Sequence, residues 1–246
     1  MKAHALEADK DEPGVLDRVM VISDIHSNLE ALQAVLSRAE ALRIWCLGDI
    51  VGYGADPNEV IKAIREHDAI ALMGNHDYAA VTGDTGGFNA RAAMTAKWTK
   101  NTLTEESAAY LRSLPAERRV QLGNVPGYLA HGSPDSAMWE YVEPRTHSEL
   151  FGHYLQRLGV KFVGLGHTHV PYVEEVEGVG TVFNPGSVGQ PRDGDSRAAY
   201  AVLSLAAGGR VQVEELRVEY DLEGAASKII AAGLPPTNAE RLYRGM

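Results

Sequence analysis

Short apolar runs alternate with amphipathic segments in the first third of the chain. Residues 19–22 are all apolar and stop at Ser23-Asp24, which predicts a fully buried strand. Ser27-Asn28-Leu29-Glu30 matches a helix capping box, and apolar residues then recur at helical spacing to about Leu42. The pattern therefore predicts a strand that leads directly into a helix.

The same alternation continues along the chain. Residues 44–47 and 69–73 are two further apolar runs, which predict two more strands. Between them, Asp56-Pro57-Asn58-Glu59 predicts the start of a helix that continues to about His67, with proline at its first position. Strands that alternate with helices predict βαβ units and a sheet with parallel pairing.

The second half of the chain has a different pattern. Residues 88–114 are expected to be helical, with Thr104-Glu105-Glu106-Ser107 at the start of a second helix. Beyond Pro115 we expect strands at 118–122, 128–131, 161–165, 172–176, 180–183, 199–205 and 210–218, a helix over 146–158, and one or two short helices after Asp221. Short turns such as Ala207-Gly208-Gly209 favour antiparallel pairing late in the chain.

Length and composition indicate one globular domain. The chain has 246 residues with 45% hydrophobic content, and no linker-like stretch divides it. Residues 1–17 mix acids, lysines and a Pro-Gly without an apolar core, which is typical of a disordered N-terminal extension and not of a signal peptide. We expect a single domain over 18–246, with a helical insert at 78–115.

Charge and cysteine content indicate which binding partners and which cellular compartment to expect. The chain carries 23 basic and 33 acidic residues, a net charge of -10, which disfavours non-specific binding to nucleic acid or to anionic membranes. No run of apolar residues is long enough to span a membrane. Cys46 is the single cysteine, so no internal disulfide can form, and we expect a cytoplasmic protein. The oligomeric state is not indicated.

Polar residues cluster where the predicted strands end. Asp24 and His26 follow the first strand, Asp49 follows the second, and Asn75-His76-Asp77 follows the third. Open α/β sheets bind ligands outside the carboxyl ends of their strands. In extended backbone, residues i and i+2 point the same way, so Asp24 and His26 are expected to point toward one site, as are His167 and His169.

Each of these clusters is weak evidence alone, because Asp, Asn and Gly also favour turns. Turns do not need histidine, however, and five of the nine histidines lie just past apolar runs. The candidate ligands together exceed what one ion needs and include no thiolate; they are Asp24, His26, Asp49, Asn75, His131, His167 and His169. Imidazole, carboxylate and amide ligands suit two divalent ions of manganese, iron, zinc, nickel or cobalt. Among these metals we expect manganese.

The order of these motifs is distinctive. Along the chain stand Asp24-Ile25-His26, Gly48-Asp49, Gly74-Asn75-His76-Asp77, His131-Gly132, Gly166-His167-Thr168-His169 and Asn184-Pro185-Gly186-Ser187. This series resembles the calcineurin-like metallophosphoesterases, in particular their small prokaryotic phosphodiesterase-type members. The resemblance implies an α/β fold with four αββα layers, in which two mixed sheets pack face to face between flanking helices.

The resemblance also implies roles for the motif residues. Asp24, His26, Asp49 and His169 would hold one metal ion, and Asp49, Asn75, His131 and His167 would hold the other. A metal-bridging hydroxide would then attack the phosphorus in line with the leaving oxygen. His76 would face the substrate, stabilise the developing charge and protonate the leaving group, and Asp77 would orient His76. Capping of the following helix is an equal alternative for Asp77.

The substrate is less clearly indicated, and no substrate-binding residue is assigned. Trp139 and Tyr141 lie on an expected loop and are candidates to line the substrate site. Phe88 and Trp98 are expected to pack within helices. Arg192 suits a contact with a second phosphate or a surface ion pair with Asp193 or Asp195. We expect a small phosphate ester, most readily a diester. The alternatives are a dinucleoside polyphosphate hydrolase, a phosphoprotein phosphatase, and a non-catalytic interaction module with the same fold.

Overall fold

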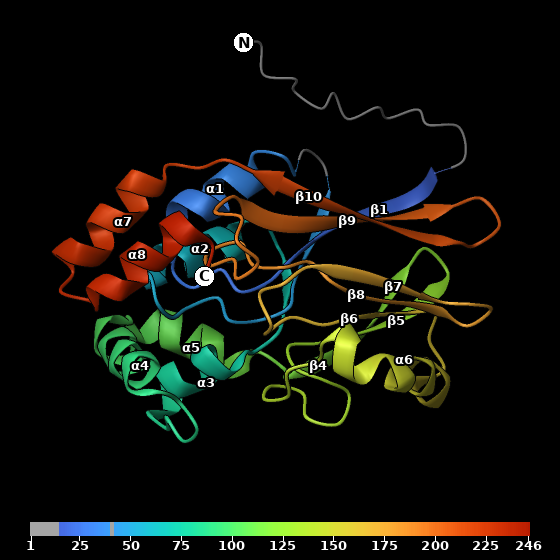
Figure 1. The fold of residues 1–246 in the computed structure, drawn as a ribbon, viewed down its shortest axis with the longest axis horizontal. Helices are drawn as coiled ribbons and strands as arrows, with labels where there is room; N and C mark the ends of the chain where they lie inside the picture. Colours follow the sequence, from blue (N-terminus) through green and yellow to red (C-terminus); the bar gives the residue numbers. More distant parts are fainter. Residues whose placement is uncertain (1–14, 40–41) are drawn as a thin grey trace, which may run out of the picture.

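The first of two five-stranded sheets contains the strands nearest the two ends of the described chain. The computed structural model describes residues 15–39 and 42–246 (Figure 1). Strand order in this sheet is β10-β9-β1-β2-β3. Its strands are β1 (Val15–Ile22), β2 (Arg43–Cys46), β3 (Ile70–Ala71), β9 (Ala198–Ala206) and β10 (Val211–Val218). β1, β2 and β3 pair in parallel, and β9 and β10 add antiparallel pairs at one edge.

The second sheet is built from the middle of the chain. Its order is β4-β5-β6-β8-β7, with parallel pairing between β5, β6 and β8 and antiparallel pairs at both edges. Its strands are β4 (Glu117–Leu122), β5 (Val125–Ala130), β6 (Phe162–Gly164), β7 (Tyr172–Val176) and β8 (Gly180–Asn184). Both sheets are therefore mixed.

Helices flank the two sheets. They are α1 (Leu29–Leu36), α2 (Pro57–Glu66), α3 (Asn75–Thr82), α4 (Ala90–Thr102), α5 (Glu105–Ser113), α6 (Pro144–Leu158), α7 (Leu222–Ala231) and α8 (Pro236–Arg244). Figure 1 shows α1 beside the first sheet, α6 against the second, and α3, α4 and α5 grouped below α8. Residues 78–115, the expected helical insert, contain most of α3 and all of α4 and α5.

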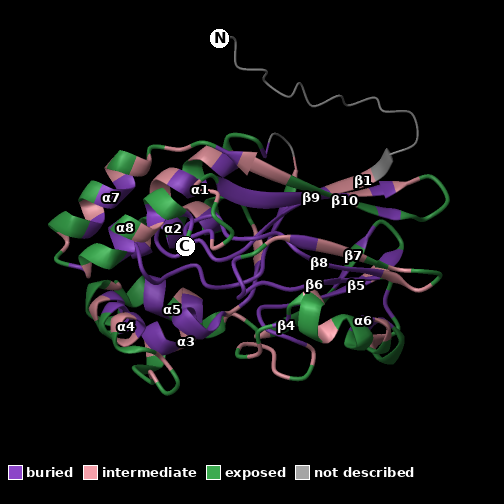
Figure 2. Ribbon diagram, in the orientation of Figure 1, coloured by how far each residue is buried: buried purple, intermediate pink, exposed green. Residues whose placement is uncertain are grey.

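The alternation of side chains along β1 explains the layers. Val19 and Val21 belong to the core between the two sheets, which also contains Phe162 and Phe183 of the second sheet. Met20 and Ile22 face the other way, into a core shared with α1 and α2. Both faces of β1 are thus buried, as its continuous apolar run predicts. The core appears as the buried band between the outer helices in Figure 2.

A third core lies on the far face of the second sheet. There Phe151, Tyr154 and Leu155 of α6 pack against Val163 and Val182. Helix, sheet, sheet and helix therefore follow one another, and the predicted four-layer αββα sandwich is confirmed.

The structure differs from the predicted boundaries at several points. β1 begins at Val15, three residues before the expected start of the fold, while residues 1–14 of the expected extension lie outside the described residues. β3 is reduced to two residues, Ile70–Ala71, and α3 begins at Asn75. Helix α1 ends at Leu36 instead of Leu42. Among residues 15–39 and 42–246, none of the helices has both the length and the apolar character needed to cross a membrane.

Two helix caps also differ from expectation. Asn28, not Ser27, caps α1, and its side chain accepts a hydrogen bond from the Ala31 N–H. Asp56 precedes α2 but makes no capping hydrogen bond with its side chain. Its carboxylate instead pairs with Lys228 of α7 at 2.9 Å, an interaction across the fold that local sequence could not indicate.

Candidate metal centre

The centre is built from loops that leave the strands at one edge of each sheet. In the first sheet, the Asp24 N–H donates to the Gly48 carbonyl and the His26 N–H to the Asp49 carbonyl, each at 3.0 Å. In the second sheet, the Gly166 N–H donates to the His131 carbonyl at 2.9 Å. Each loop is thus fixed to its neighbour by backbone hydrogen bonds, which positions the side chains before any ion binds.

The backbone conformation of these loops corrects one expectation. Five of the candidate ligands adopt positive φ angles and not the expected extended backbone, namely 53° at Asp24, 49° at His26, 51° at Asp49, 66° at His167 and 62° at His169. Left-handed backbone costs roughly 1–2 kcal/mol for a residue with a side chain. The chain must turn sharply as it leaves each strand, and the strain is concentrated at the residues that face the centre.

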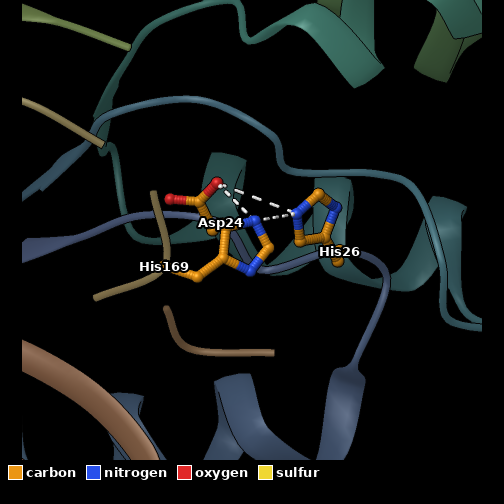
Figure 3. Close-up of side chains that lie close together, drawn as sticks. All are labelled: Asp24, His26 and His169. Atoms are coloured by element: carbon orange, nitrogen blue, oxygen red, sulfur yellow. Dashed lines mark hydrogen bonds and ion pairs between the residues drawn. The ribbon is translucent and has the colours of Figure 1, made fainter. Parts of the chain in front are cut away.

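Asp24, His26 and His169 form the first cluster (Figure 3). The His26 and His169 Nε2 atoms are 3.0 Å apart. Asp24 Oδ1 lies 3.2 Å from His169 Nε2 and 3.7 Å from His26 Nε2. Two imidazole nitrogens aimed at each other and at a carboxylate repel unless a proton or a cation lies between them, so this arrangement fits a cation site.

The second cluster contains Asp49, His131 and His167, with Asn75 beside them. His131 Nε2 lies 3.2 Å from both Asn75 Oδ1 and His167 Nδ1. Asp49 Oδ2 is 3.4 Å from His131 Nε2 and 3.6 Å from His26 Nε2 of the first cluster. A single carboxylate oxygen therefore faces both clusters.

Asp24 and Asp49 present their oxygens in the same way. The Ser23 hydroxyl and the His167 N–H donate to Asp24 Oδ2, at 2.6 and 3.1 Å. The His76 N–H donates to Asp49 Oδ1 at 2.8 Å. Asp24 Oδ1 and Asp49 Oδ2 are buried without a hydrogen-bond partner among the described residues. Burial of a carboxylate oxygen costs free energy unless the oxygen is paired or binds a metal, so these two atoms are suited to be metal ligands.

Hydrogen bonds to the backbone orient three of the histidine rings. In each ring Nδ1 contacts a main-chain carbonyl, at 2.9 Å for His131 and Leu47, 2.5 Å for His169 and Gln190, and 3.3 Å for His26 and Val51. A carbonyl can only accept, so Nδ1 carries the proton and Nε2 is left with a lone pair facing the centre. Such contacts are typical of metal-binding histidines.

The ionisation of the side chains also fits metal binding. Burial, with the charge of His131, lowers the pKa of His167 to about 3. Burial opposes ionisation of Asp24, but the charge of His169 holds the pKa of Asp24 below its ordinary value. His131 differs: burial disfavours its charge, yet the Asp49 carboxylate raises its pKa to about 9. A bound cation would displace that proton.

The motif that begins at Asn184, the last residue of β8, contacts the loop that carries His167 and His169. The Asn184 side-chain amide donates to the Gly166 carbonyl at 2.7 Å and to the Thr168 hydroxyl at 3.0 Å. The Ser187 hydroxyl donates to the Asp24 carbonyl at 2.7 Å. Asn184 thus contacts the neighbours of His167, and Ser187 contacts the backbone of Asp24, so both residues position the loops that carry candidate ligands.

His76 and Asp77 lie in the first turn of α3 but have different surroundings. The His76 ring is 4.9 Å from the His26 ring, and its Nδ1 has no hydrogen-bond partner among the described residues. Burial lowers the pKa of His76 to about 4. The Asp77 carboxylate accepts from the N–H groups of Gly74, Ile50 and Val51, at 2.9, 3.2 and 2.9 Å. These contacts favour the helix-capping alternative, and Asp77 also fixes the loop after β2.

Aromatic rings surround His76 and His167. The Tyr141 ring stacks on His167 at 3.9 Å, and Trp139 lies 6.5 Å from Phe88. Tyr141 is 49% exposed and Trp139 is 41% exposed, which keeps both available to a ligand. Phe88 was expected to pack within a helix, but it precedes α4 and its ring lies 4.6 Å from the His76 ring. Trp98, by contrast, packs against α7 and α8 as expected of a core residue.

Sequence reasoning missed Tyr53. Its ring lies 4.7 Å from the His26 ring and 4.6 Å from the His76 ring, so it forms one side of the centre. The flanking glycines, Gly52 and Gly54, were the available signal. A Cβ atom on Gly52 would lie 2.7 Å from His26 Nδ1, so the loop can approach the histidines only because this residue is glycine.

The family follows from a comparison with known proteins. Residues 18–208 match the family model of the calcineurin-like phosphoesterase superfamily domain. This chain belongs to that superfamily. The predicted enzyme class, a metal-dependent phosphoester hydrolase, is thereby confirmed.

Several known proteins resemble this superfamily member over nearly the whole length of both chains. The uncharacterized protein MJ0912 of Methanocaldococcus jannaschii is 36% identical over 250 residues, which cover 94% of this chain and 99% of that protein. A metallophosphoesterase from Sphaerobacter thermophilus is 35% identical, with a TM-score of 0.78, and the match covers 94% of this chain and 99% of that one. The protein PH1004 of Pyrococcus horikoshii has a TM-score of 0.84 at 24% identity, with the same coverage, and supports the fold alone.

Proposed function

We propose that this chain hydrolyses a small phosphate ester, most readily a diester, at a centre of two divalent transition-metal ions. The observation that carries this proposal is the position of Asp49 Oδ2, a buried oxygen without a hydrogen-bond partner among the described residues, which lies 3.6 Å from His26 Nε2 and 3.4 Å from His131 Nε2. A carboxylate oxygen shared between two ligand clusters is what a two-ion centre requires.

The remaining ligands divide between the two ions. Asp24, His26 and His169 would hold the first ion with Asp49. Asn75, His131 and His167 would hold the second ion with the same Asp49 carboxylate. The ligand set contains imidazole, carboxylate and amide groups and no thiolate, so we propose manganese, with iron, zinc, nickel or cobalt as alternatives.

Two such ions would supply a bound water of lowered pKa and a positive charge that polarises the phosphoryl oxygens. The protein contributes His76, whose ring lies 4.9 Å from the His26 ring on the side of the centre bounded by Phe88. From there the neutral His76 ring would donate a hydrogen bond to the phosphoryl group. The negative charge of a bound phosphate would raise the pKa of His76, so that the protonated ring could give a proton to the leaving oxygen. Such acid–base help typically contributes about 10²–10⁴-fold.

The aromatic residues support a diester with a flat group on the non-leaving side. Phe88, Trp139 and Tyr141 lie around the His76 and His167 rings, and two of them are partly exposed. A ring on the substrate can stack on such side chains, which is worth roughly 0.5–1.5 kcal/mol beyond buried area. A monoester lacks the second ester group and would leave this surface unused.

The test is hydrolysis of bis(4-nitrophenyl) phosphate compared with 4-nitrophenyl phosphate by protein supplied with manganese. We expect turnover of both and a higher kcat/KM for the diester. Tyr141→Ala should reduce kcat/KM for the diester more than for the monoester, because it removes the stacking surface and leaves the ligands intact. Folded protein that turns over neither substrate with any of the proposed metals would refute the proposal, and a preference for the monoester would refute the diester assignment.

A further inference from the structure

Three arginines from separate parts of the chain lie on the Tyr53 side of the centre. Arg91 is in the first turn of α4, Arg192 is in the loop between β8 and β9, and Arg241 is in α8. Arg241 lies outside residues 18–208, the part that matches the family model. None of the three forms an ion pair with a carboxylate within residues 15–39 and 42–246. Three neighbouring arginines without a carboxylate partner are unusual in a protein with 33 acidic residues.

Two of the three arginines lie against the same aromatic ring, that of Tyr53. The guanidinium carbon of Arg91 lies 5.3 Å from the centroid of the Tyr53 ring, and that of Arg192 lies 6.0 Å from it. Contacts between guanidinium and aromatic rings are favourable, but they do not neutralise the charge. The two like charges therefore remain close together around Tyr53.

Helix α8 brings the third arginine to the same place. The Asn238 amide donates to the Tyr53 carbonyl at 2.9 Å and to the Thr95 hydroxyl of α4 at 3.2 Å. Arg241 follows Asn238 by three residues and so lies on the same face of α8. Burial and the charges of Arg91 and Arg192 lower the pKa of Arg241 to about 10, in keeping with this proximity.

The carboxylates near Arg192 in the sequence are engaged elsewhere. Asp193 pairs with Arg217, and Asp195 pairs with Arg197 at 2.6 Å. The sequence-based prediction that Arg192 forms a surface ion pair with Asp193 or Asp195 is therefore wrong. The Nε atoms of Arg192 and Arg241 are buried without a hydrogen-bond partner among the described residues, which leaves donors aimed at no acceptor.

The arginines adjoin the metal centre. The Tyr53 ring that carries two of them lies 4.6 Å from the His76 ring. The Arg192 N–H donates to the His169 carbonyl at 3.2 Å, so the backbone of Arg192 is fixed to a candidate ligand. An anion held by the arginines would therefore lie beside the metal centre.

We propose that Arg91, Arg192 and Arg241 bind a second phosphoryl group of the substrate, one that is not attacked. The proposal rests on the proposed phosphoesterase function and narrows its substrate to phosphate esters that carry a further phosphate. Guanidinium groups suit this ligand because their N–H donors match phosphate oxygens in pairs. The positive charge of the three arginines also attracts an anionic substrate, although the protein as a whole has a net charge of -10.

Calorimetric titration of the manganese-loaded protein tests the second site without turnover. The probes are propane-1,3-bisphosphonate, which has two phosphonates, and propylphosphonate, which has one. We expect wild-type protein to bind the bisphosphonate at least about tenfold more tightly, since hydrogen bonds to charged groups contribute about that much each. Arg241→Gln and Arg91→Gln should each remove most of this preference.

Arg244→Gln is the matched control, because it removes the same charge from the exposed side of the same helix. This variant should keep the wild-type preference. Equal affinity of wild-type protein for the two probes, or an undiminished preference in both Arg241→Gln and Arg91→Gln, would overturn the proposal. Because binding alone is measured, this outcome is independent of whether bis(4-nitrophenyl) phosphate is hydrolysed.

Discussion

The Asp49 carboxylate accepts a hydrogen bond from the backbone N–H of His76, with 2.8 Å between Oδ1 and the nitrogen. This bond connects the carboxylate that faces both ligand clusters to the residue proposed to face the substrate. It uses the backbone of His76 and not its ring. The hydrogen bond that orients Asp49 is therefore retained without the His76 side chain, even though a His76 ring nitrogen lies within 4.8 Å of the ligand atoms of Asp49 and His26.

Substitution of His76 by alanine should consequently leave metal binding almost intact. The backbone donor to Asp49 remains, whereas the ring that would protonate the leaving oxygen is gone. We expect metal content near the wild-type value, measured by elemental analysis, and a kcat lower by about 10²–10⁴-fold. Equal rates for the variant and the wild type would show that the role assigned to His76 is wrong.

Asp77→Ala should act on stability. Asp77 is fully buried, and its carboxylate accepts three backbone hydrogen bonds from Gly74, Ile50 and Val51. Each buried N–H left without an acceptor costs roughly 1–3 kcal/mol, so the free energy of unfolding should fall by several kcal/mol in urea denaturation. Asp84→Ala, at an exposed position with one hydrogen bond to the Gly86 N–H, is the control and should cost less than about 1 kcal/mol.

Gly52→Ala should disturb the centre without changing any charged or ligating group. Gly52 has a φ of 125°, and an added Cβ would lie 2.7 Å from His26 Nδ1 and 2.8 Å from His76 Nδ1. Displacement of these rings by a fraction of an ångström to 1 Å should reduce kcat/KM by about 10²-fold. Gly152→Ala, where the new Cβ would make ordinary contact at 3.6 Å with Val176, is the comparison. It should retain activity and stabilise α6 by about 0.5–1 kcal/mol.

Removal of metal should destabilise the fold. Asp24 and Asp49 are at most 1% exposed, and the repulsion between their charges opposes burial unless cations are present. Restoring manganese to about 100 times its Kd should add about 2.7 kcal/mol, which corresponds to roughly 5–10 °C in Tm for a chain of this size. Thermal unfolding of chelator-treated protein, titrated with manganese, measures this difference. An unchanged Tm at saturating metal would contradict a centre assembled from these carboxylates.

Local pattern was sufficient for most elements because their apolar periodicity matches their burial. The continuous run at 19–22 predicted a strand buried on both faces, and Val21 and Ile22 indeed belong to different cores. Thr104 was expected to start a helix, and its hydroxyl accepts from the Ser107 N–H at 3.1 Å. Prediction was poorer where tertiary contacts compete with local signals, as for Asp56, which binds Lys228 instead of capping α2.

The candidate ligands were predictable for a related reason, whereas their backbone geometry was not. A histidine directly after an apolar run is unusual in a turn, so its position indicates the centre. The i and i+2 argument assumed extended backbone, but Asp24 and His26 adopt φ angles of 53° and 49°. The chain reverses at the sheet edge, and no local sequence pattern fixes a left-handed conformation for a residue other than glycine or asparagine.

By itself, the amino-acid sequence determined the alternation of strands and helices, the polar residues at the strand ends and the family to which their order belongs, because those properties depend on short-range periodicity and motif spacing. Only the tertiary structure decided that one oxygen of Asp49 faces two clusters and that Arg91 and Arg192 lie at Tyr53, where helix α8 with Arg241 is also held. Residues so distant along the chain meet only when both sheets and the C-terminal helices are packed. Their meeting is a property of the assembled layers, which no local segment encodes.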